Sequence, residues 1–189
     1  MTMFNLQEAA VGYAKSAERV LGEDSEFINN NQEVLPVFVA LLFQSVEISL
    51  KHLGIESGLF TENESRDRKL TKNSHGVKEI ADLVNERLRA DRDYPLVTAL
   101  TVGLKDEWSP EIFQQMVFGS DFARTRKAYQ CRNLGYARLR QGDLSVVQGL
   151  KPWAQSVRRI AENLPKAIDV VKQWKASPSK STHFAIWYK

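Results

Sequence analysis

The residue types best suited to chemistry gather between Phe122 and Gly142, where six cations occur without an acidic residue. These cations are Arg124, Arg126, Lys127, Arg132, Arg138 and Arg140. An arginine guanidinium is a planar fork that can hold a phosphate through two hydrogen bonds and can also stack on a base. The segment is therefore suited to binding the phosphate groups of a nucleic acid or a nucleotide.

Aromatic residues alternate with these cations, because Phe122, Tyr129 and Tyr136 recur every seven residues. An aromatic face stacks an unpaired base with about 1 to 3 kcal/mol, while cations neutralise the backbone phosphates. We therefore predict a nucleic-acid-binding set that consists of Arg124, Arg126, Lys127, Tyr129, Arg132, Asn133, Tyr136, Arg138 and Arg140. The same spacing is typical of a buried stripe on a helix, so tyrosines that belong to the core remain an alternative.

Charge is divided unevenly along the 189 residues. Residues 1–121 contain 12 Lys and Arg against 20 Asp and Glu, a net charge of −8, and residues 122–189 contain 14 against 3, a net charge of +11. Such asymmetry indicates an anionic partner, either RNA or an acidic protein. It is also consistent with a basic part that neutralises the acidic part within one chain or across a dimer.

Few other residues could support catalysis or bind a metal. The three histidines, His52, His75 and His183, lack the spacing of a metal site, and the single Cys131 can form neither an internal disulfide nor a Cys-rich zinc site. We therefore expect no cofactor and no metal. We interpret His52 as a packed helical residue and His75 as a cap at a helix start. A ribonuclease that uses either of these two histidines remains an alternative.

Apolar residues at steps of three and four predict helices in the first half of the chain. The first spans Leu6 to Leu21, with Gly22 as an αL cap. A central helix follows from about residue 33 to 53, with Pro36 in its first turn and Gly54 as its stop. Residues 61–74 are polar and predict a surface loop, and a third helix begins near His75.

The second half has the same helical character. Residues 94–104 and 112–118 predict two shorter helices, the latter with Ser109 as N-cap and Pro110 in its first position. The stripe from Trp153 to Trp174 predicts one long helix that is kinked at Pro165. Residues 141–143 indicate either a small β-hairpin or a plain loop, and residues 183–189 a strand or an ordered tail.

Together these elements predict an all-α fold, an antiparallel bundle of five to seven helices, with the small hairpin or an ordered C-terminal tail as an addition. We assign one domain to residues 1–176 and a linker and tail to 177–189. No apolar run approaches the roughly 18 residues of a membrane helix, and no secretory signal is visible. We therefore expect a cytoplasmic protein that does not enter a membrane.

Two segments resemble the HEPN family, the higher eukaryote and prokaryote nucleotide-binding domains. Phe43 to Leu53, FQSVEISLKHL, has Gln, Glu and Leu-Lys at helical spacing, and Ser74 to Val84, SHGVKEIADLV, is similar to the family's His followed by a leucine-rich helix. The resemblance implies an antiparallel helical bundle, commonly dimeric. It also implies one of several roles: a metal-independent ribonuclease of toxin–antitoxin or defence systems, a nucleotide-binding partner of a nucleotidyltransferase, or a non-catalytic version.

The family's nuclease motif is incomplete in this chain. That motif has an Arg, a polar residue that is often Asn, and a His four to six residues after the Arg. Arg132 and Asn133 match its opening, but Ala137, Arg138 and Leu139 stand where the His would be. Because RNA cleavage through the 2′-OH needs a group that moves a proton near neutral pH, the resemblance implies ribonuclease activity that is lost or degenerate.

The leading hypothesis is therefore a HEPN-like homodimer that binds RNA or a nucleotide through its basic segment. The alternative is a non-catalytic interaction module that docks an acidic protein partner.

Overall fold

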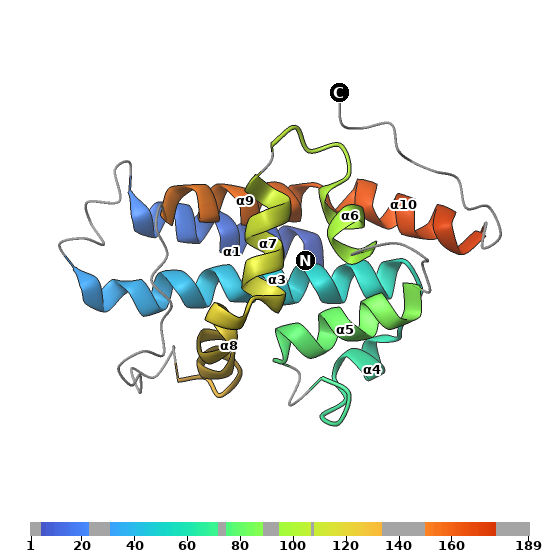
Figure 1. Ribbon diagram of the computed structural model, residues 1–189, viewed down its shortest axis with the longest axis horizontal. Coiled ribbons are helices and arrows are strands. Elements are labelled where there is room, and N and C mark those ends of the chain that lie inside the picture. Colours follow the sequence, from blue (N-terminus) through green and yellow to red (C-terminus); the bar gives the residue numbers. More distant parts are fainter. Residues whose placement is uncertain are drawn as a thin grey trace, which may run out of the picture.

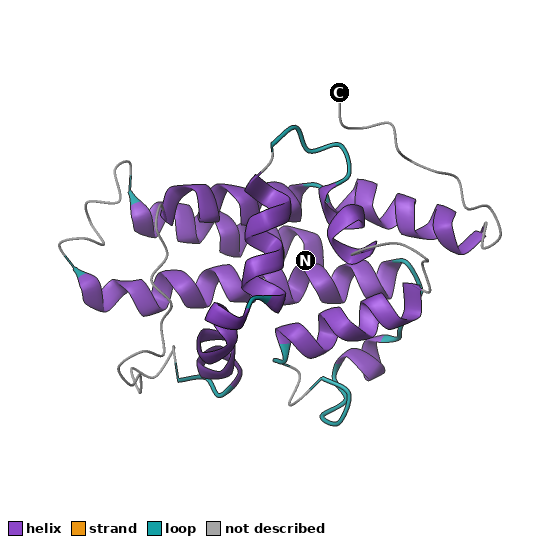
Figure 2. Ribbon diagram, in the orientation of Figure 1, coloured by secondary structure: helices purple, strands orange, loops and turns teal. Residues whose placement is uncertain are grey.

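The computed structural model describes residues 5–22, 31–71, 75–88, 95–106, 108–133 and 150–176. Over these residues the protein is all-α, as predicted, and contains no strand (Figures 1 and 2). The α-helices are α1 (Leu6–Leu21), α3 (Leu35–Glu56), α4 (Glu62–Ser65), α5 (Val77–Leu88), α6 (Pro95–Thr101), α7 (Trp108–Phe118), α8 (Ala123–Gln130), α9 (Leu150–Glu162) and α10 (Leu164–Ala176), and the 3₁₀ turns are η1 (Gln32–Val34) and η2 (Ser120–Phe122). The predicted hairpin at 141–143 and the tail at 177–189 lie outside the described residues.

The central element is α3, which packs against α1, α5 and α9 (Figure 1). Pro36 lies in its first turn, where the missing N–H would have no helical partner. Its apolar side chains point in several directions, and Phe38, Leu42 and Phe43 are buried in the core. By length and composition alone α3 could cross a membrane, but most of its apolar stretch is covered by the neighbouring helices, as in a core helix.

Helix α1 runs antiparallel to α3, and both of its ends match their sequence signals (Figure 1). Asn5 and Glu8 form a reciprocal capping box at the start, and Gly22 follows the end with a φ of 69°. The ψ of Gly22 is −166°, so the predicted αL cap is wrong, although the positive φ still favours glycine. The Ser45 hydroxyl of α3 donates to the Ala10 carbonyl at 2.8 Å and fixes the two helices side by side.

Gly54 does not end α3, because the helix continues to Glu56. A Cβ atom at Gly54 would lie 2.1 Å from the ring of Phe60, which is buried against this position. Gly54 therefore allows the Phe60 ring to pack against the helix backbone, and it does not terminate the helix. The prediction was wrong because a glycine near a helix end has the same local signature in both cases.

We expect Gly54→Ala to lower the free energy of unfolding by about 1 to 3 kcal/mol, since the Phe60 ring must move inside a packed core. Gly12→Ala on α1 is the matched control, because nothing lies within 4 Å of its added Cβ. The free energy of unfolding of that control should rise by about 0.5 to 1 kcal/mol, because alanine has the higher helix propensity. Urea denaturation measures both, and a gain in stability for both variants would contradict the packing role of Gly54.

The loop predicted for residues 61–74 contains a short helix, α4. Its start is capped reciprocally by Thr61 and Glu64, a pattern that matches a capping box. Arg87 of α5 donates to Glu64 at 2.8 Å. The hydrogen bond from Arg87 and those from Thr61 lower the pKa of the Glu64 carboxyl to about 2. The described residues of α4 are thus fastened to α5 in spite of their polar composition.

Two predictions about the later helices also need correction. Helix α7 begins before Ser109, and Asp106 caps it by accepting a hydrogen bond from the Ser109 N–H at 2.7 Å. The predicted long helix with a kink at Pro165 is divided into α9 and α10 at Asn163. The Asn163 amide donates to the carbonyls of Leu100 and Val102, which holds the junction against the end of α6.

The described part of the chain contains nine α-helices, more than the five to seven predicted. The additional ones come from the one-turn α4 and the division at Asn163. Their buried apolar side chains form one contiguous core to which all of the longer helices contribute.

Candidate functional site

A buried carboxylate, Glu47, is the centre of a polar cluster between α3, the start of α5 and the end of α8. The Glu47 side chain is 2% exposed. Its Oε1 accepts a hydrogen bond from Lys51 Nζ at 2.5 Å, and its Oε2 accepts one from the Tyr129 hydroxyl at 2.6 Å. The same Oε2 lies 3.1 Å from Nδ1 of His75. A buried carboxylate is costly without such partners, so these bonds fix its position.

The second nitrogen of His75 contacts Arg132, whose Nη2 lies 2.9 Å from Nε2. A guanidinium can only donate hydrogen bonds, so Nε2 must accept and therefore has no proton. The proton of the neutral ring is then on Nδ1 and is donated to Glu47. The imidazole is thus held in one tautomer, with its lone pair directed toward Arg132, and its side chain remains 25% exposed.

This role of His75 differs from the predicted helix cap. At the start of α5 the carbonyl of Gly76 accepts the first helical hydrogen bond, from Ile80 N–H at 2.9 Å. The His75 ring points instead to Glu47 of α3 and to Arg132 beyond α8. His75 therefore connects two elements that are far apart in the sequence.

Arg132 occupies an unusual backbone position. The N–H of Asn133 bonds to the Ala128 carbonyl, and that of Arg132 bonds to the Tyr129 carbonyl, each at 2.8 Å. This is the Schellman pattern at a helix C-terminus, and it places Arg132 at the residue that is usually glycine. Its φ is 58°, the only positive φ among the described non-glycine residues. The strained backbone holds an exposed guanidinium beside His75.

Tyr129 is part of the core and does not offer a surface for base stacking. It is 8% exposed, its ring stacks on Phe43 with centroids 5.4 Å apart, and its hydroxyl is bonded to Glu47. Its inclusion in the nucleic-acid-binding set is therefore wrong, and the alternative of a core tyrosine holds at this position. Burial and the negative charge of Glu47 raise the pKa of Tyr129 above its ordinary value.

We expect the raised pKa of Tyr129 to appear in the stability at alkaline pH. The unfolded phenol loses its proton as the pH rises through about 10, whereas the folded one keeps it, so the free energy of unfolding falls above that pH. Tyr129→Phe removes this contribution. The variant should lose about 1 to 3 kcal/mol at neutral pH, because Glu47 loses a donor.

The measurement is the free energy of unfolding by urea at neutral pH and at about pH 11. The variant should show a smaller decrease between the two than the wild type. Tyr13→Phe at an exposed tyrosine of α1 is the control and should stay within about 0.5 kcal/mol of the wild type at neutral pH. An equal alkaline decrease in Tyr129→Phe and wild type would contradict the prediction.

Arg126 is also used inside the molecule. Its Nη1 donates to the carbonyls of Met116 at 3.0 Å and of Gly119 at 2.9 Å, at the end of α7. Burial lowers the pKa of Arg126, and the nearby charges of Glu79 and Asp82 oppose that effect. Arg126 therefore stabilises a helix terminus, and its place in the nucleic-acid-binding set stays a prediction.

The other members of the predicted set have different surroundings. Arg124 and Lys127 are exposed and, three residues apart, share the outer face of α8. Asn133 is half-buried next to Arg132. Tyr136, Arg138 and Arg140 lie outside the described residues. Within the predicted set the exposed cations that the structure describes are thus Arg124, Lys127 and Arg132.

Some charges of the basic C-terminal part are paired with the acidic part of the same chain. Arg158 of α9 bonds to Glu18 of α1 at 2.9 Å, and Arg159 bonds to Asp106 at 3.1 Å. Intrachain neutralisation, one of the interpretations of the charge asymmetry, therefore accounts for these two arginines. It does not account for Arg132, whose guanidinium contacts an imidazole.

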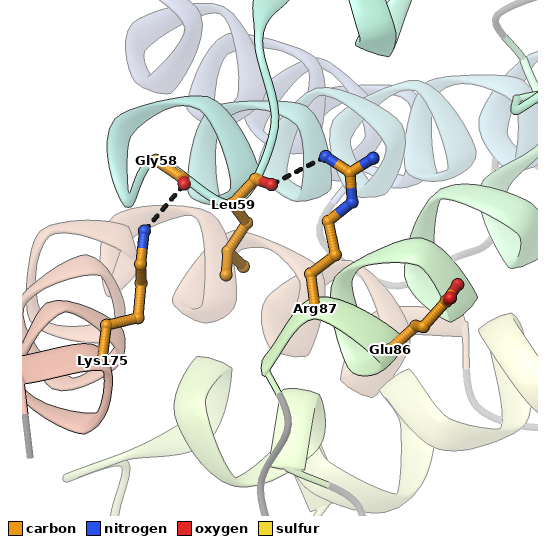
Figure 3. Close-up of a pocket in the computed structure, with 5 residues that line it drawn as sticks. All are labelled: Gly58, Leu59, Glu86, Arg87 and Lys175. Atoms are coloured by element: carbon orange, nitrogen blue, oxygen red, sulfur yellow. Dashed lines mark hydrogen bonds between the residues drawn. The ribbon is translucent and has the colours of Figure 1, made fainter. Parts of the chain in front are cut away.

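A separate hollow of about 460 Å³ is lined by Gly58, Leu59, Glu86, Arg87 and Lys175 (Figure 3). Figure 3 shows Lys175 and Arg87 pointing toward the turn that follows α3. Lys175 donates to the carbonyls of Ser57 and Gly58, and Arg87 donates to that of Leu59. These cations satisfy carbonyls at a helix end, so we interpret the hollow as a structural junction.

The remaining candidates add little chemistry. Burial lowers the pKa of His52, and the charge of Glu56 opposes this effect. Cys131 is exposed. In the described ranges no group of three or more His, Cys, Asp or Glu residues could hold a metal ion. The cluster of Glu47, His75 and Arg132 is therefore the best candidate site.

A scan against protein-family models and searches of curated proteins and of solved structures found no match to this chain.

Proposed function

We propose that the protein binds single-stranded RNA, or a nucleotide, by holding a phosphate with the guanidinium of Arg132. The observation that carries the proposal is the exposed Arg132 side chain, held at a strained helix end beside His75. Strain of this kind is concentrated at functional sites, since a glycine would otherwise be favoured. Its contact with a neutral imidazole leaves the positive charge of Arg132 available to an anion.

Two further cations support a polyanion as the ligand. Arg124 and Lys127 are exposed on α8, the helix that ends just before Arg132. A row of cations along one short helix suits successive phosphates, and each phosphate that is neutralised releases counterions. The resemblance to HEPN domains points to the same class of ligand, and we include a homodimer in a toxin–antitoxin or defence system as part of the proposal.

The test is the fluorescence anisotropy of a labelled single-stranded oligouridine, titrated with protein at salt concentrations from about 50 to 200 mM. Affinity should fall steeply with salt, and Arg132→Ala should weaken binding about tenfold, the cost of one charged hydrogen-bonding group. Arg66→Ala removes an exposed arginine of the α4 region and is the matched control. An affinity that ignores salt, or equal affinities of the two variants, would contradict the proposal.

The second candidate is an interaction module for an acidic protein. It is favoured by the net charge of +11 in residues 122–189, and it predicts a purified protein that carries no nucleic acid. The ultraviolet absorbance ratio of the purified protein distinguishes the two, since RNA that copurifies supports the first candidate only.

A further inference from the structure

The inference concerns the regulation of Arg132 by pH, and it rests on the proposed binding of a phosphate by that residue. We propose that binding is proton-linked: when His75 takes up a proton, its ring releases the Arg132 guanidinium, and the affinity for a polyanion rises as the pH falls. His75 thus acts through Arg132, as a regulatory residue and not as a ligand of the phosphate.

The two ring nitrogens of His75 respond differently to a proton. Nδ1 lies 3.1 Å from Oε2 of Glu47 and can donate to that carboxylate whether the ring is neutral or charged. Nε2 lies 2.9 Å from Nη2 of Arg132 and can accept a hydrogen bond from it only while Nε2 carries no proton. Protonation therefore breaks the hydrogen bond to Arg132 and keeps the one to Glu47, so the ring itself stays in place.

Charge acts in the same direction as the lost hydrogen bond. A charged imidazole repels the guanidinium, and the exposed Arg132 side chain can turn toward solvent while its backbone stays at the end of α8. A phosphate offers the guanidinium a charge-assisted, bidentate partner, and its negative charge stabilises the imidazolium beside it. Phosphate and proton therefore favour each other's binding, and this coupling is reciprocal.

Several other charged or titratable groups surround the His75 ring in the described part of the chain. They are Glu47 and Lys51 of α3, Tyr129 of α8, whose ring lies edge-on to the imidazole, and Glu79 of α5, which lies against the neighbouring Gly76. Lys51 pairs with Glu47 at 2.5 Å and offsets its charge. Burial raises the pKa of Tyr129, so its phenol keeps its proton near neutral pH. Imidazole is the side chain that ordinarily titrates between about pH 5 and 8, so His75 can change the charge beside Arg132 in that range.

The test is anisotropy titration of a labelled single-stranded oligouridine with the full-length protein at about pH 8 and about pH 6, at constant ionic strength. Neither the phosphodiesters nor uracil titrate between these values, so the protein is the source of any change. We expect the wild type to bind about tenfold more tightly at the lower pH, the effect of one charged hydrogen-bonding group. Isothermal titration calorimetry in buffers of different ionisation enthalpy should show uptake of protons on binding.

Two variants assign the effect to one histidine. The amide of His75→Gln takes up no proton, so its affinities at the two pH values should agree within about twofold. His52→Gln is the matched control on α3 and should keep the full gain. Thermal melting at both pH values verifies that the variants are folded. Equal gains in wild type and His75→Gln, or binding by the wild type without proton uptake, would overturn this inference and leave the binding proposal intact. Failure of the wild type to bind at either pH would overturn both.

Discussion

Glu47→Ala is expected to lower the free energy of unfolding by about 3 kcal/mol, because it removes one member of a buried ion pair. The reason is that Glu47 is 2% exposed and accepts hydrogen bonds from Lys51 and Tyr129 as well as the contact with His75. Removing the carboxylate leaves these donors facing a cavity, so the loss exceeds that of one ordinary hydrogen bond. Urea denaturation at neutral pH measures it.

The control for this prediction is Glu62→Ala. Glu62 also forms an i, i+4 ion pair, with Arg66, but both members of this pair are exposed. Exposed pairs of this spacing contribute about 0.3 to 0.5 kcal/mol, so the control should remain close to the wild type. If Glu47→Ala and Glu62→Ala lose the same stability, Glu47 is not the centre of a buried network.

The second large effect is expected at Arg132, where stability should depend on the backbone conformation and ligand binding on the guanidinium. Arg132→Gly relieves the positive φ and should be more stable than Arg132→Ala by about 1 kcal/mol. Both variants lose the guanidinium, so both should bind oligouridine about tenfold more weakly than the wild type. If Arg132 served the fold alone, the more stable glycine variant would not bind oligouridine more weakly than the wild type.

The measurements are thermal or urea denaturation together with anisotropy titration of the same three proteins. Equal stability of the glycine and alanine variants would contradict the strained backbone. Binding that glycine restores but alanine does not would show that the helix end, and not the guanidinium, determines affinity.

Local patterns in the sequence were sufficient to predict the main helices. The steps of three and four in α1 and α5 reflect one buried face each, and the apolar character of α3 reflects burial on several sides. The end of α3 and the start of α7 could not be predicted in this way, because a residue such as Gly54 or Ser109 has the same local signature inside a helix as at its end. Only the ring of Phe60 and the carboxylate of Asp106 decide these cases.

The candidate site shows a similar division. The arginines were visible as a charge cluster, and Glu47 with Lys51 as an i, i+4 pair, but nothing local indicated that the pair is buried. The contact of His75 with Arg132 joins residues 57 positions apart and depends on the packing of α3, α5 and α8. The seven-residue spacing of Tyr129 is equally compatible with a buried helix stripe and with a surface that stacks bases. Its contacts with Phe43 and Glu47 show that it belongs to the core.

Whether Arg132 binds a phosphate is decided by a crystal structure of the protein with a single-stranded oligouridine. The expected result is a phosphate oxygen within hydrogen-bonding distance of the Arg132 guanidinium, with His75 Nδ1 still in contact with Glu47. An oligonucleotide bound elsewhere, with the contact between Arg132 and His75 intact, would contradict it.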